Sequence, residues 1–125
     1  MSAEKSREAP GRDKTLVAFA IDDELRQRIL EVLDEVRGTG TRKARSAALA
    51  AVVSEMTRNG LDYYFLRPLE QAEVGFINLN AARIGLASAG KSIPIVIRKV
   101  IGSLDERQLL AIADSVEELL VEPSR

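Results

Sequence analysis

The chain has 125 residues, enough for one domain or for two small modules that share a core. It contains no cysteine and no histidine, which excludes the usual zinc sites, thiol nucleophiles and imidazole-based triads. Its 18 basic and 19 acidic residues leave a formal charge of -1, so no overall field favours nucleic acid or a membrane. We therefore expect a protein that is not an enzyme and needs no cofactor.

The first residues are charged, which differs from a secretory signal, and no uncharged apolar run approaches the ~18 residues of a membrane span. These features predict a cytoplasmic protein with no transmembrane segment. Residues 1–13 are polar and mixed in charge, and we expect them to form a disordered arm.

The segment over residues 16–21 is short, apolar and rich in β-branched and aromatic side chains. It predicts a β-strand, and an additional helical turn is the alternative. The three acids at residues 22–24 favour the strand, because acidic side chains mark the start of a helix better than its middle.

Two helices are expected next. Apolar residues recur at helical spacing from Leu25 to Val36, and the glycines that follow are typical of a helix end. A second helix is expected over residues 44–59, where alanines raise helix propensity and Asn59 with Gly60 marks the stop.

This order of elements over residues 14–60 resembles the ribbon-helix-helix fold of small bacterial DNA-binding proteins. The likeness is carried by the apolar segment at 16–21, the acidic helix start at 22–25 and the turn and helix entry at 40–49. It implies an intertwined dimer with a two-stranded ribbon in the DNA major groove and a second helix that meets phosphate. The residues it assigns to DNA, chiefly to phosphate, are Lys14, Arg42, Lys43 and Arg45.

The second half predicts about three more helices over residues 61–122. Aromatic residues at 63–65 are expected to form a hydrophobic hinge, and a platform for stacking bases is the alternative. A helix from Pro68 to Gly90 has polar residues scattered around it, which implies burial on several sides and hence a homodimer or higher oligomer. A further helix is expected to start at Ser92, and a last one to be capped by Ser103.

Residues 85–92 match the phosphate-loop pattern G-x-x-x-x-G-K-S. That loop needs a buried strand before it and a helix after it, whereas the residues before it look helical and Pro94 follows at once. We interpret Gly90 as a helix stop and Ser92 as the next helix cap.

No acid lies between Glu73 and Asp105, and the basic side of this stretch holds Lys91, Arg98 and Lys99. Beside the apolar face of residues 93–104, these cations suit a partner protein, a granule or an anionic membrane. The expected fold is mainly α with a short N-terminal strand. The leading function is DNA binding, as in a transcriptional regulator, and the alternative is a scaffold that docks on such a surface through its C-terminal helices.

Overall fold

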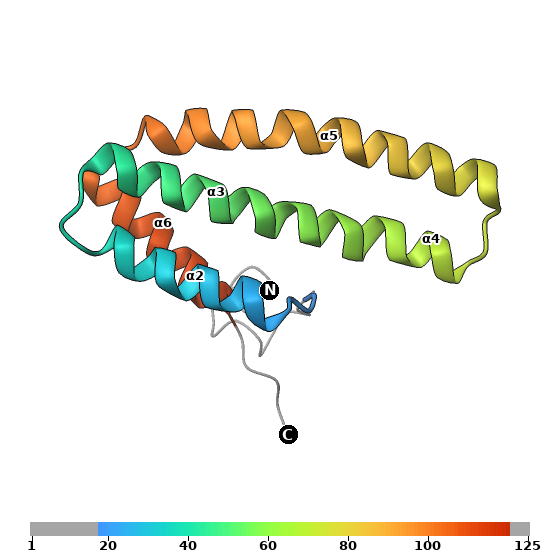
Figure 1. Cartoon of the computed structure of the whole chain (residues 1–125), viewed down its shortest axis with the longest axis horizontal. Coiled ribbons are helices and arrows are strands. Elements are labelled where there is room, and N and C mark those ends of the chain that lie inside the picture. The colour runs from blue at the N-terminus through green and yellow to red at the C-terminus, as the bar shows by residue number, and fades with distance from the viewer. Residues whose placement is uncertain (1–17, 121–125) are drawn as a thin grey trace, which may run out of the picture.

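A computed structural model describes residues 18–120 of the protein. In these residues the elements are α2 (Asp23–Val36), α3 (Arg42–Leu61), the π-helix η1 (Asp62–Leu66), α4 (Arg67–Gln71), α5 (Phe76–Gly102) and α6 (Glu106–Leu119). The run from α3 to α4 lies beside α5 as a long helical hairpin, and α2 and α6 pack at one end of it (Figure 1). The prediction of a mainly α protein is confirmed.

The predicted N-terminal β-strand is wrong, because residues 18–22 are irregular and no strand occurs anywhere in residues 18–120. A lone extended segment leaves its backbone groups unpaired, and the described part of the chain offers it no second strand. The ring of Phe19 instead packs edge-on against Tyr64, with centroids 5.5 Å apart, and lies 6.1 Å from Tyr63. The predicted arm at residues 1–13, Lys14 and the start of the predicted strand lie outside the described residues.

The first two predicted helices are confirmed, and local capping explains where they begin. The carboxylate of Asp22 accepts a hydrogen bond of 2.8 Å from the backbone N–H of Leu25 at the start of α2. The hydroxyl of Thr41 accepts one of 3.1 Å from the N–H of Ala44 at the start of α3. Each cap satisfies an N–H group that has no partner within its own helix.

The expected boundaries in the second half need three corrections. The predicted helix from Pro68 to Gly90 is interrupted by a turn that contains Glu73 and Gly75. Gly90 does not end a helix, and α5 continues through Pro94 because it packs against α3 along the hairpin. Tertiary packing therefore outweighs the loss of one backbone hydrogen bond at the proline.

The third correction concerns the start of α6, where the cap is Asp105 and not Ser103. The Asp105 carboxylate accepts from the Gln108 N–H at 2.8 Å, and the Gln108 side chain accepts from the Asp105 N–H at 3.0 Å. The aromatic segment is also helical, since η1 carries the helix on from α3 without a turn. Residues 85–92 lie inside α5, so they form no phosphate-binding loop.

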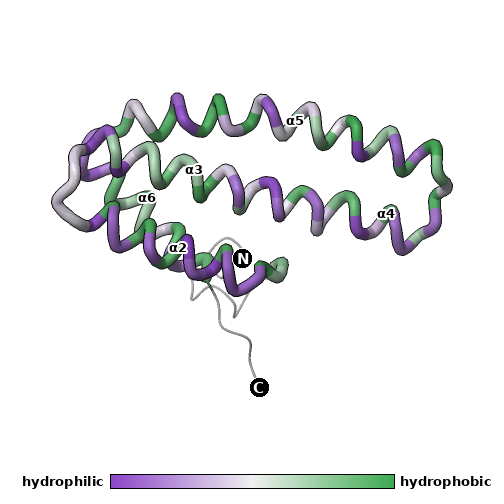
Figure 2. The backbone as a smooth tube through the Cα atoms, in the orientation of Figure 1, coloured by the Kyte–Doolittle hydropathy of each residue, from purple (hydrophilic) through white to green (hydrophobic). Residues whose placement is uncertain are grey.

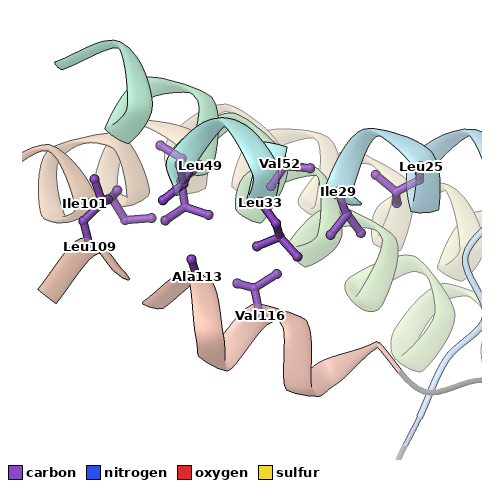
Figure 3. Close-up of a cluster of buried hydrophobic side chains, with 11 residues drawn as sticks. Leu25, Ile29, Leu33, Leu49, Val52, Ile101, Leu109, Ala113 and Val116 are labelled. Atoms are coloured by element: carbon purple, nitrogen blue, oxygen red, sulfur yellow. The ribbon is translucent and has the colours of Figure 1, made fainter. Parts of the chain in front are cut away.

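The hydrophobic core lies at the end of the hairpin where α2 and α6 pack (Figure 3). Each of four helices contributes to it, with Leu33 from α2, Leu49 from α3, Ile101 from α5 and Leu109 from α6. Beyond α2 and α6 the hairpin consists of two helical layers, and hydrophobic residues continue along α5 to its far end (Figure 2). That part of α5 therefore leaves apolar side chains without a covering layer.

Candidate surface-binding site

The cations predicted to meet DNA have separate structural roles at the start of α3. Arg45 is buried, with 6 % of its surface exposed. Its guanidinium donates to both carboxylate oxygens of Glu106, at 2.9 and 2.5 Å, and to the backbone carbonyl of Val36 at 2.8 Å. Arg45 therefore ties α3 to α6 and to the end of α2.

This ion pair changes the acidity of both partners. Hydrogen bonds from Arg45 hold the pKa of Glu106 below its usual value, against the opposing effect of desolvation. The same hydrogen bonds raise the pKa of Arg45. Arg42, a turn earlier, donates to the backbone carbonyl of Leu104. Two of the predicted DNA contacts thus hold the helices together. Of the predicted residues within 18–120, only Lys43 has an exposed side chain without a hydrogen bond or ion pair.

A second arginine ties α2 to α6 on the surface. The Arg37 guanidinium donates to Asp114 at 2.6 Å and to Glu117 at 2.8 Å. Hydrogen bonds to these two carboxylates raise the pKa of Arg37. Exposed pairs of this kind contribute little to stability, about 0–1 kcal/mol. Arg37, like Arg42 and Arg45, is therefore not a free cation.

The predicted surface residues of α5, unlike the arginines described above, have side chains without partners in the described part of the chain. Lys91, Arg98 and Lys99 are all exposed, and none of their side chains makes a hydrogen bond or ion pair with a residue in the range 18–120. Arg83, the other cation of α5, donates to Glu70 of α4 at 3.0 Å. Three free positive charges therefore lie on the second half of a helix that contains no acid.

The structure brings Lys43 together with two of these cations. Lys43, Arg98 and Lys99 line one open groove of about 360 Å³ between the start of α3 and the last turns of α5. Lys91 lies apart from them, in a second cavity of about 370 Å³ between α3 and α5 that also contains Arg58 and Asp62. The sequence placed Lys43 in a different predicted site from Arg98 and Lys99.

Large apolar side chains are exposed along the same helix. Ile77, Ile84 and Ile95 are 81 %, 62 % and 57 % exposed. They are spaced by 7 and 11 residues, which places them in one line along an α-helix. We call these three residues and the cations beside Ile95, namely Lys91, Arg98 and Lys99, the α5 face.

The apolar face expected over residues 93–104 is partly buried and partly exposed. Ile101 is buried and Ile97 packs against the core, but Val96 and Val100 are more than half exposed. The exposed Ile77 and Ile84 were not predicted as surface residues. The scattered polar residues in this region were the available signal, because they indicated a helix with apolar side chains on several sides.

The described residues contain no group of three histidine, cysteine, aspartate or glutamate side chains arranged to hold a metal ion. None of the helices between residues 18 and 120 is both long enough and apolar enough to cross a lipid bilayer. No protein-family model, curated protein or solved structure matches this chain.

Proposed function

We propose that the protein docks on an anionic lipid surface through the α5 face. The observation that carries this proposal is the combination of exposed isoleucines with free cations on a helix that has no acidic residue. On an interfacial helix, apolar side chains enter the boundary of the acyl chains while basic side chains meet anionic headgroups. Each lysine or arginine near such a surface contributes about 1 kcal/mol.

The spacing of the residues supports this arrangement. Lys91 and Lys99 lie four residues before and after Ile95, and Arg98 lies three residues after it. Residues three and four apart are neighbours on the surface of a helix. The cations therefore flank the apolar line, and their long aliphatic stems allow the charges to remain in the headgroup region while Ile95 enters deeper.

A second copy of the chain fits the α5 face less well than an anionic surface does. Packing two α5 faces against each other would bury free cations of both helices, and neither helix has an acid to pair with them. Burying an unpaired charge opposes association. The homodimer or higher oligomer expected from the sequence stays a prediction, and this charge pattern favours a different surface for it.

DNA binding also stays a prediction, with weaker support than the lipid surface. The structure has no ribbon in residues 18–120, and Arg42 and Arg45 already hold carbonyl and carboxylate oxygens within the protein. The docking function requires no residue that is already engaged in this way.

Reversing one charge on α5 and, as a control, one charge on α6 tests the proposal by its effect on vesicle binding. Co-sedimentation with vesicles of phosphatidylcholine and phosphatidylglycerol should show binding that weakens with salt and is absent with phosphatidylcholine alone. Arg98→Glu is expected to weaken binding about 25-fold, since it removes one favourable charge and adds an unfavourable one.

Arg107→Glu is the matched control, because Arg107 is an exposed arginine without a partner in residues 18–120 and lies on α6. We expect less than about a twofold change for this variant. Circular dichroism should show both variants to be helical. Equal binding of Arg98→Glu and the unmodified protein, or equal binding to neutral and anionic vesicles, would refute the proposal.

A further inference from the structure

The open groove beside the α5 face has a charge pattern that the docking function does not by itself explain. Its volume is about 360 Å³, and its walls come from two helices. The lining residues are Lys43, Ser46, Ala47, Ile95, Arg98 and Lys99. Three of these six are cations and none is an acid.

The cations of this groove are not neutralised by the protein. The side chains of Lys43, Arg98 and Lys99 make no hydrogen bond or ion pair with residues in the described range. Glu106, the acid that pairs with the cation at the start of α3, is held by Arg45 through two hydrogen bonds. The Ser46 hydroxyl donates to the backbone carbonyl of Lys43 at 3.1 Å, which helps to fix the α3 wall. A shallow, open surface whose charged side chains are all positive attracts anions.

We propose that this groove binds a phosphate monoester, and that on a lipid surface it selects headgroups that end in one. This inference rests on the proposed docking function for the lipid part, and on the groove alone for the phosphate part. A phosphate monoester carries a charge of about -1.5 to -2 at neutral pH and offers three acceptor oxygens. A phosphodiester carries one charge and has fewer free oxygens, so it satisfies fewer of the three cations.

Ile95 connects the two surfaces. It lines the groove and also belongs to the apolar line of the α5 face, where it is 57 % exposed. A phosphate held by the groove would therefore place its attached acyl chains next to apolar side chains. A free phosphate monoester would gain the contacts of the groove but not those of the apolar line.

Vesicles of equal surface potential test the selectivity. One set contains phosphatidic acid, whose headgroup is a monoester, and the other contains phosphatidylglycerol, a diester. We expect the full chain to bind the monoester vesicles about fivefold more tightly, the gain of one additional cation near the charge. Lys43→Gln should reduce this ratio to about one, and Arg107→Gln should leave it unchanged.

Equal affinity for the two vesicle types at matched potential would overturn the lipid selectivity. Titration with glycerol 3-phosphate in solution, followed by NMR of the Lys43 and Lys99 amides, tests the groove without any membrane. Saturable shifts that are lost in Lys43→Gln would support the phosphate site. If these shifts were seen but no vesicle were bound, the docking function would be refuted and the phosphate site would stand. The absence of shifts together with equal vesicle affinity would refute the site.

Discussion

At the scale of single residues, neighbouring cations at the start of α3 differ in burial and in ion pairing. Arg45 is buried against Glu106, whereas Lys43, two residues earlier, points to solvent and lines the groove. The difference comes from helical geometry, because residues two apart face different directions. A buried charge also requires a partner, and α6 supplies one to Arg45.

The Arg45–Glu106 pair predicts a specific dependence of stability on pH. The pKa of Glu106 is lowered in the folded protein, chiefly by hydrogen bonds from Arg45, so its carboxylate stabilises the fold above the ordinary pKa of a glutamate, about 4.3. This contribution is lost as the pH falls through the lowered value in the folded state. Glu106→Gln should therefore be less stable than the unmodified protein at pH 7, and the difference should shrink in acid.

Urea unfolding at pH 7 and at pH 3, followed by circular dichroism, measures this effect. Glu118→Gln serves as the control, since Glu118 is exposed on the same helix and has no ion pair within residues 18–120. A Glu106→Gln deficit that stays constant between the two pH values would contradict the assignment of the stabilisation to the charged form.

At the scale of elements, the hairpin depends on the turn between α4 and α5. Gly75 has φ 100° and ψ 160° at the start of α5, a conformation that is essentially restricted to glycine. Gly85 lies inside α5, and a Cβ added there meets no atom within 4 Å. The cap position before α5 therefore requires glycine, whereas position 85 inside the helix can accept a side chain.

Alanine substitution should show this contrast. Gly75→Ala is expected to lower the free energy of unfolding by about 1–3 kcal/mol, because alanine is strained in this conformation. Gly85→Ala should raise it by about 0.5–1 kcal/mol, since alanine favours the helix interior and has space at this position. Chemical denaturation measures both values, and changes of the same sign would contradict the described turn.

At the scale of the whole molecule, one end of the hairpin has a core and the rest of α5 has an uncovered side. Four helices meet at the core, where Leu49 is fully buried. Ile84, near the other end, is 62 % exposed. The same type of substitution should therefore have very different effects at the two positions.

We expect Leu49→Ala to lower the free energy of unfolding by about 2–5 kcal/mol, because it removes buried methyl groups and leaves a cavity. Ile84→Ala should change it by less than about 0.5 kcal/mol, since the side chain is already in water. Thermal unfolding at two protein concentrations measures both. A large, concentration-dependent loss for Ile84→Ala would instead show that Ile84 is buried between copies of the chain.

Much of the helical structure follows from local sequence. The cap at Asp22, the acids in the first turn of α2 and the apolar spacing from Leu25 to Val36 are all short-range signals. The unpaired backbone groups at a helix end are satisfied by residues a few positions away, so capping residues can be predicted from the sequence. The sequence also shows that α5 has no acidic residue and several basic ones. This pattern predicted the cations of the α5 face but not its exposed isoleucines.

Other features were decided by residues far apart in the chain. Whether residues 16–21 pair as a strand depends on a partner strand, and whether Gly90 and Pro94 end a helix depends on packing against α3. The sequence analysis assigned Arg45 to DNA, but in the structure Arg45 forms an ion pair with Glu106, 61 residues away. Composition and local periodicity thus determined a mainly helical chain with a basic, acid-free segment in its C-terminal half. Tertiary structure decided which cations are free and which apolar side chains are exposed, because burial and ion pairing depend on long-range contacts.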